Sequence, residues 1–223
     1  MSMFVEAKTN QPVPFEIGGV VLGGYTGRDQ ESVRRHIAEL AAHGVPAPEQ
    51  APAFYSATPN VVVADAAIDV LGGETSGEAE FIMLRAGGEL FVGVGSDHTD
   101  RALERESVRY AKQVCPKVVS REVWRYADVA THWERVTLRS FTGTERRLYQ
   151  EGPAAEMLDP EDILARTQQR TGRGLDDVLV FSGTLPLVGE LSFGERFEVE
   201  LVDETNGERL SVQYHINVID PLD

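Results

Sequence analysis

The sequence predicts an α+β protein that is rich in β-strands and has a few helices. Short β-branched or alternating runs dominate the chain from residue 60 onward, as in "EAEFIMLR" and "ELFVGVG". Only a few segments combine helical spacing of apolar residues with helix-capping residues. The helices do not alternate strictly with the strands, which argues against a doubly wound parallel sheet.

Composition limits the classes of partner. The 223-residue chain is 42% hydrophobic, which is enough for a real core, and its formal charge of −15 disfavours nucleic acid, because phosphate binding needs basic patches. No apolar run approaches the roughly 20 residues that cross a bilayer, so no membrane partner is expected. The single cysteine, Cys115, and the lack of a secretory signal predict a cytoplasmic protein.

Residues 1–55 are expected to form a small N-terminal region, and residues 56–223 the main domain. Short strands are predicted within residues 1–24. A helix then follows Asp29, its N-cap, because apolar residues recur at helical spacing; these are Val33, Ile37, Leu40 and Ala41. The Pro/Ala-rich stretch 44–54 is predicted to be a linker or surface loop.

The rest of the chain is predicted to alternate irregularly between strands and helices. Expected strands are 60–64, 66–71, 78–85, 89–95, 134–141, 177–183, 195–203 and 209–219. Turns are expected at 86–88 and 206–207. Expected helices are 100–113, 120–130 with Ser120 as N-cap, and 158–172, where Asp159, Pro160 and Gly172 provide the start and stop signals.

Three carboxylates are predicted to meet at one end of a sheet. Glu78 and Glu80 lie two residues apart and therefore point to the same face of a strand, which turns apolar on both faces after them. If the two strands pair as a hairpin, Asp97 returns to the same end. Such oxygen ligands suit Mg²⁺ or Mn²⁺. The alternative is that the two glutamates are solvated acids at a strand end.

Other candidates are weaker on residues alone. His36 and Glu39 are helix-surface neighbours, so the acid can orient the imidazole, but His36 also fits a half-buried structural role. Lys117 lies among apolar residues, where desolvation would lower its pKa, or it extends to solvent from a surface strand. Thr184 follows a strand in a glycine- and proline-containing loop that either binds a carboxylate or is a plain turn.

Five short motifs in order resemble the fumarylacetoacetate hydrolase superfamily over roughly residues 20 to 202. They are "GYTGRDQESVRRHIAEL" with Tyr25 and H-x-x-E, "VPAPEQAPAFY", "GEAEF", "GVGSDHTDR" and "SGTLPLVGELSFGERFEVEL". In the fourth motif Asp97, Thr99 and Arg101 fall on the metal aspartate, the hydroxyl position and the arginine. Lys117 falls at the expected distance beyond the aspartate. Thr184 matches the family threonine.

The resemblance implies a mixed β-roll with a few peripheral helices, a homodimer, and Mg²⁺ or Mn²⁺ held by Glu78, Glu80 and Asp97. It implies a lid helix on which His36 and Glu39 activate water. Lys117 would stabilise an enolate. Tyr25, Arg101 and Thr184 would contact the substrate.

The expected function is metal-dependent hydrolysis of a C–C bond in a small oxo-acid of the acylpyruvate or β-diketone type. Decarboxylation, hydration and isomerisation share an enolate-like intermediate and stay open, as does a non-catalytic metabolite-binding role on the same scaffold. The chain departs from the family pattern at Ala102, at Tyr55 and Ser56, and at Glu195, which indicates a divergent, bacterial branch with an altered substrate pocket.

Overall fold

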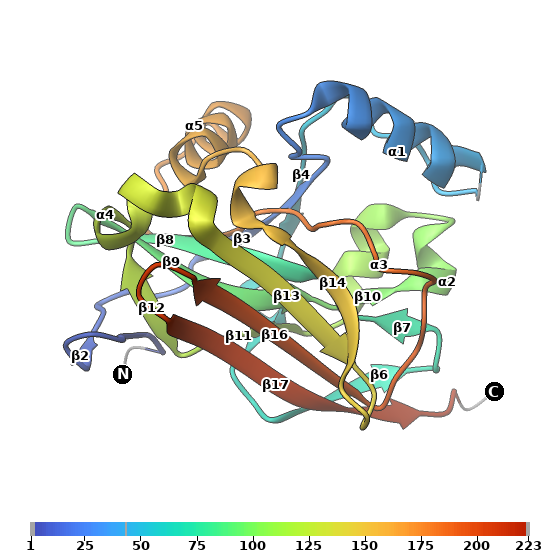
Figure 1. The fold of residues 1–223 in the computed structure, drawn as a ribbon. Helices are drawn as coiled ribbons and strands as arrows, with labels where there is room; N and C mark the ends of the chain where they lie inside the picture. The colour runs from blue at the N-terminus through green and yellow to red at the C-terminus, as the bar shows by residue number, and fades with distance from the viewer. Residues whose placement is uncertain (1–2, 43, 222–223) are drawn as a thin grey trace.

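The computed structural model describes residues 3–42 and 44–221, without the side chains of residues 36, 39 and 40. The larger of its sheets has the strand order β2-β1-β12-β9-β8-β15-β3-β4, and β11 joins it by pairing with β9 and with β5 (Figure 1). Its strands are β1 (Val5–Glu6), β2 (Gln11–Pro12), β3 (Gly19–Gly24), β4 (Ala53–Ala57), β5 (Val62–Val63), β8 (Ala79–Ala86), β9 (Glu89–Asp97), β11 (Lys117–Val119), β12 (Glu122–Arg125) and β15 (Val178–Phe181).

A second sheet packs against the first, in front of it in Figure 1. Its order is β14-β13-β16-β17-β6, and its strands are β6 (Ala67–Leu71), β13 (Val136–Thr142), β14 (Arg147–Pro153), β16 (Arg196–Asp203) and β17 (Glu208–Ile219). Strand β6 runs parallel to β17, whereas the other pairs in this sheet are antiparallel. A two-stranded sheet joins β7 (Thr75–Ser76) to β10 (Thr99–Asp100). The expected strand-rich α+β class with a mixed sheet is confirmed.

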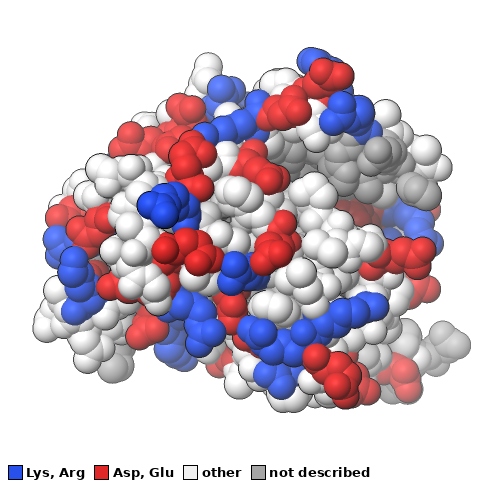
Figure 2. Space-filling view, viewed as in Figure 1, with Lys and Arg blue, Asp and Glu red and all other residues white. Residues whose placement is uncertain are grey.

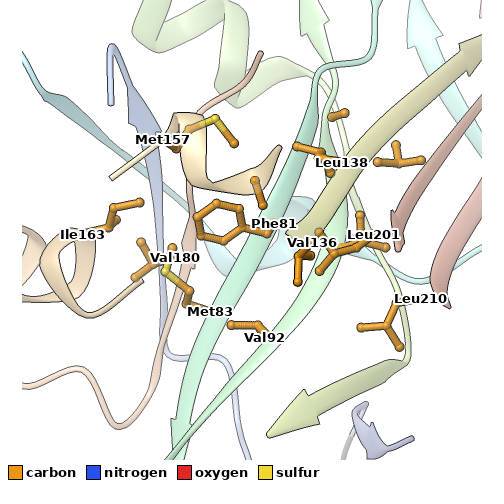
Figure 3. Packing of buried hydrophobic residues seen from close by; sticks show 14 of the residues in the cluster. Phe81, Met83, Val92, Val136, Leu138, Met157, Ile163, Val180, Leu201 and Leu210 are labelled. Carbon is orange, nitrogen blue, oxygen red and sulfur yellow. The ribbon is translucent and has the colours of Figure 1, made fainter. Parts of the chain in front are cut away.

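Strand β8 is covered on both faces, as its sequence predicted. Phe81 and Met83 on one face belong to the core between the two sheets, where they pack with residues such as Val136 (Figure 3). Ile82 and Leu84 on the other face belong to a second core. All four are fully buried. Because burying one such side chain contributes roughly 1.5–3 kcal/mol, β8 is fixed strongly in place.

The helices lie around the edges of the sheets (Figure 1). They are α1 (Gln30–Ala42), α2 (Arg101–Glu104), α3 (Val108–Val114), α4 (Tyr126–Val129) and α5 (Pro160–Thr171), with short 3-10 segments η1 (Pro59–Val61), η2 (Ala130–Arg135) and η3 (Ala154–Glu156). Helix α5 follows its sequence signals, since the Asp159 side chain accepts from the Glu161 N–H and Gly172 adopts φ +66°.

Several local predictions were wrong. Residues 122–125 form a strand, not a helix, because Val123 and Trp124 are buried against both neighbours of β12. The expected helix 100–113 is broken into α2 and α3, and Ser107 caps the second. Strands β4, β7, β10, β11 and β14 were missed, β4 because its first two residues end the predicted loop 44–54, and residues 14–17 form no strand. The division at residue 55 stays a prediction; β3 and β4 lie in the same sheet as β8 and β9.

The described surface mixes both signs of charge. Lys and Arg occur singly or in short groups among Asp and Glu on the face seen in Figure 2. Within residues 3–42 and 44–221, no helix combines the length and the apolar character needed to span a bilayer.

Candidate metal centre and its cavity

The β8–β9 hairpin brings the three predicted carboxylates together. Its register pairs Glu80 with Gly95, and the Asp97 N–H donates to the carbonyl of Glu78 at 3.0 Å. One carboxylate oxygen from each of Glu78, Glu80 and Asp97 lies within 4.8 Å of the others. The grouping therefore follows directly from strand pairing.

Glu80 is the least compensated of the three acids. It is fully buried, and one oxygen, Oε2, accepts the N–H of Gly183 at 2.8 Å. Its other oxygen, Oε1, has no hydrogen-bond partner among the described residues. Burial raises the pKa of Glu80 well above the usual range of a glutamate, and the charge of Asp97 adds to this.

Lys112 of α3 bridges the other two carboxylates. Its Nζ lies 2.9 Å from Glu78 Oε2 and 2.5 Å from Asp97 Oδ2. Burial would lower the pKa of Lys112, but the two acids outweigh it and raise the pKa. Burial would likewise raise the pKa of Glu78, yet Lys112 and Arg101 lower it to about 2. Glu78 therefore stays ionised.

Lys117 contacts Asp97 from the neighbouring strand β11. The β11–β9 register places the two residues opposite each other, and Lys117 Nζ lies 2.9 Å from Asp97 Oδ1. The same ammonium donates to the carbonyl of His98 at 2.6 Å and is completely buried. Burial lowers its pKa despite the attraction of Asp97. Lys117 does not line the cavity described below, whereas Lys112 does.

His98 anchors the backbone that follows Asp97. Its two ring nitrogens lie 2.9 Å from the Tyr214 hydroxyl and 2.9 Å from Thr75 Oγ1. Burial lowers the pKa of His98 to about 3, so the ring is neutral. Tyr214 in turn is bonded to Ser96. These bonds fix the end of β9 that carries Asp97.

Two residues expected at the substrate are engaged with protein groups. Arg101 contacts Glu78 Oε1 at 3.1 Å and Glu104 Oε2 at 3.0 Å, and it does not line the cavity. Thr184 lines the cavity, but its hydroxyl donates to the carbonyl of Ala79 at 2.8 Å. The single hydroxyl proton of Thr184 is thus used to hold the loop after β15 against the start of β8.

A cavity of about 460 Å³ is lined by Glu78 and Glu80, two of the three carboxylates. Its lining comes from the end of β3 and the start of α1, from β4, from α2 and α3, from η3, and from the loop after β15; it includes Tyr25, Arg28, Asp29, Ser32, Val33, Tyr55, Glu104, Val108, Lys112, Glu156 and Leu185. The volume suits a small molecule. Tyr25 lies at this wall with φ +57°, a backbone conformation that is unusual outside glycine.

The side chains of His36 and Glu39 lie outside the described residues. Their backbone belongs to α1, the helix whose first turn, at Asp29, Ser32 and Val33, lines the cavity. The proposed water-activating role of His36 and Glu39 stays a prediction.

The residues fit a hard divalent cation. The three acids offer oxygen atoms only, which Mg²⁺ and Mn²⁺ prefer. A buried carboxylate oxygen without a partner is costly, and a cation at Glu80 Oε1 would satisfy it. Glu78, Glu80 and Asp97 would hold the ion.

Sequence reasoning missed Lys112 and undervalued Tyr55. Lys112 falls in a stretch predicted to be helical, four residues after Val108, so both residues face the same way. That spacing would have indicated a lysine on one face of a helix but not which face meets Asp97. Tyr55 was noted only as a departure from the family pattern, whereas it lines the cavity.

Comparison with protein families assigns residues 23–214 to a profile described as "Protein of unknown function (DUF2848)". The chain belongs to the DUF2848 family. No match was found among proteins with curated descriptions.

Solved structures show that this DUF2848 protein has the fold of the fumarylacetoacetate hydrolase group. It is similar to a proposed fumarylacetoacetate isomerase/hydrolase from Oleispira antarctica, with TM-score 0.70, 20% identity, and coverage of 97% of this chain and 100% of that one. A proposed fumarylpyruvate hydrolase from Burkholderia cenocepacia gives TM-score 0.66, 17% identity, and coverage of 97% and 94%. A 2-keto-3-deoxy-D-arabinonate dehydratase complexed with magnesium and 2,5-dioxopentanoate gives TM-score 0.64, 17% identity, and coverage of 93% and 75%. The resemblance drawn from the sequence is confirmed for the fold.

Proposed function

We propose that this protein is a divalent-metal-dependent enzyme that acts on a small 2-oxo acid. One observation carries the proposal: the buried Glu80 Oε1 has no described hydrogen-bond partner, and it lies beside Glu78 and Asp97 at a cavity of about 460 Å³. A cation held by the three acids would compensate their charge, and the cavity beside Glu78 and Glu80 would receive the substrate. A structural neighbour that holds magnesium and a dioxo ligand supports this assignment.

In this proposal, some residues hold the metal ligands in place and another stabilises negative charge on the substrate. Mg²⁺ or Mn²⁺, when bound, supplies Lewis-acid polarisation of the oxo oxygen. Lys112 faces the cavity as a permanent cation, so it can stabilise negative charge that develops on an enolate oxygen. Lys117 and Arg101 hold Asp97 and Glu78 in place from the protein side. The enolate role predicted for Lys117 thus passes to Lys112 in this proposal.

For the reaction, we favour hydrolysis of a C–C bond in an acylpyruvate-type substrate. His36, oriented by Glu39, would take a proton from water as it attacks a carbonyl. The C–C bond would then break, and the electron pair would be held as an enolate beside Lys112. Decarboxylation, hydration and isomerisation use the same enolate, so products have to be identified directly with acylpyruvate and oxaloacetate as substrates.

The test separates metal binding from catalysis. Isothermal titration of Mn²⁺ into wild-type protein, Glu80→Gln and Lys112→Met is expected to show binding lost in Glu80→Gln only. Turnover is expected to be lost in both. Lys8→Met serves as the control, because that lysine is exposed. Unchanged Mn²⁺ affinity in Glu80→Gln would exclude this metal centre, and unchanged turnover in Lys112→Met would exclude the enolate role.

Two further expectations belong to the proposal. A cytoplasmic location, expected from the single cysteine of the sequence, is kept as part of the proposal. The homodimer implied by the family resemblance stays a prediction.

A further inference from the structure

The cavity wall beyond the three metal-site acids is itself acidic. Asp29, Glu104 and Glu156 line it, and the basic residue among these outer lining groups is Arg28. These residues are called the outer wall below. The cavity is also lined by Glu80, whose buried Oε1 has no hydrogen-bond partner in the part of the chain that the structure describes, which indicates a ligand site rather than a surface hollow. The outer wall therefore determines which groups a bound oxo acid can carry at its tail, the end remote from the 2-oxo acid group.

The positive charge of Arg28 is already matched. Its NH1 group donates to Glu134 Oε1 at 2.6 Å, and its backbone N–H donates to the Glu156 carbonyl at 2.8 Å. Lys112, the other cation on the wall, is held by Glu78 and Asp97. Glu104 is paired with Arg101, but the described residues form no salt bridge with Asp29 or Glu156, so a second carboxylate on the substrate would meet these two acids.

Hydroxyl groups complete the wall. Tyr25 and Tyr55 come from β3–α1 and β4, and Ser32 comes from the first turn of α1. Burial raises the pKa of Tyr25 to about 12 and also raises that of Tyr55, so both phenols are protonated. Carboxylates that accept and hydroxyls that both donate and accept match the hydroxyl groups of a ligand.

We propose that the outer wall of this cavity selects a 2-oxo acid with an uncharged, hydroxylated tail and rejects one with a second carboxylate. Asp29 and Glu156 oppose the second carboxylate, whereas Tyr25, Tyr55 and Ser32 bond the tail hydroxyls. Glu134 determines this selectivity indirectly, because it occupies Arg28. The inference rests on the proposed function, since the metal-bound end of the ligand fixes where its tail lies.

Three five-carbon ligands test the selectivity in the presence of Mn²⁺. They are 4,5-dihydroxy-2-oxopentanoate, 2-oxopentanoate and 2-oxoglutarate, which share the 2-oxo acid end and differ in the tail. Calorimetry is expected to rank them in that order, with at least about a tenfold gap between the first and the last, since like charges a few ångströms apart repel strongly at a partly buried site. Equal or tighter binding of 2-oxoglutarate overturns the inference.

Glu134→Ala provides an independent test. It releases Arg28, so the affinity for 2-oxoglutarate is expected to rise several-fold while that for 2-oxopentanoate stays constant. Glu204→Ala is the matched control, because Glu204 pairs with Arg139 at 2.9 Å and neither lines the cavity. An unchanged 2-oxoglutarate affinity in Glu134→Ala contradicts the role of Glu134.

The same measurements distinguish a failure of the proposed function from a failure of the selectivity alone. If Mn²⁺ binds but none of the three oxo acids does, the proposed function fails and the selectivity fails with it. If all three bind equally well, the proposed function stands and only the selectivity is wrong.

Discussion

Replacing Glu80 with glutamine is expected to change stability in opposite directions without and with metal. The substitution keeps the shape of the side chain and removes the charge. In metal-free protein the charge of Glu80 is unfavourable, because the side chain is fully buried beside Asp97 and Oε1 has no described partner. Glutamine should therefore raise the stability of the metal-free protein.

The magnitude follows from the separation of the acids. Carboxylate oxygens of Glu80 and Asp97 lie within 4.8 Å, and two unit charges at that distance repel by about 3 kcal/mol at an effective dielectric constant of about 20. Lys112 attracts Glu80 and offsets part of this, so a net gain of about 1–2 kcal/mol is expected. For a chain of this length that corresponds to a rise in Tm of roughly 2–8 °C.

The assay is thermal unfolding with and without Mn²⁺. Wild-type protein should gain about 2.7 kcal/mol when Mn²⁺ is present at about 100 times its Kd, whereas Glu80→Gln should gain almost nothing. The variant is thus the more stable form without metal and the less stable form with it. Equal destabilisation of Glu80→Gln under both conditions would refute the reasoning, since it would make Glu80 a purely structural residue.

Two further predictions concern a strained loop and a buried acid. Gly183→Ala should weaken Mn²⁺ binding and cost well over 1 kcal/mol in chemical denaturation, because a Cβ would lie 2.3 Å from Thr26 Oγ1 at φ +91°. Gly189→Ala, at φ +96° with open space, should cost only about 1–2 kcal/mol and leave Mn²⁺ affinity unchanged. Burial would raise the pKa of Asp203, but hydrogen bonds, first among them that from His132, lower it. Its contribution is therefore fully present above the unfolded-state value of about 3.9, and it is lost as pH falls below that value and through the lower pKa of the folded state. Asp203→Asn should cost about 1–3 kcal/mol at pH 7, and urea titrations should show the gap closing below about pH 4; a constant gap across this range would contradict the assignment.

The sequence predicted the parts of the fold that local patterns determine. Helix α5 begins and ends at its capping residues, and strand β8 is buried on both faces, as the apolar residues on both of its faces indicated. The grouping of Glu78, Glu80 and Asp97 also required only one hairpin, because an antiparallel register returns the chain to its starting point.

Other features depended on partners that are distant in sequence. Residues 122–125 were predicted to be helical because their spacing suits a helix, but β9 and β1 provide edges on either side that make a strand more favourable. Lys112 could be placed on a helix but not against Asp97, since that contact depends on how α3 packs. The acidic outer wall was hidden for the same reason: Asp29, Glu104 and Glu156 come from three separate segments.

The two ends of the cavity come from different parts of the fold, and this difference affects how substitutions can change the substrate of such a protein. The candidate metal ligands lie on the β8–β9 hairpin, whose apolar neighbours fill two cores, so substitutions of those neighbours also damage folding. The outer wall comes instead from the segment after β3, from α2, which has no buried residue, and from η3, where Glu156 is exposed although Ala154 and Ala155 are buried. A lineage could therefore exchange one substrate tail for another through surface-segment mutations alone, and keep the same reactive centre throughout.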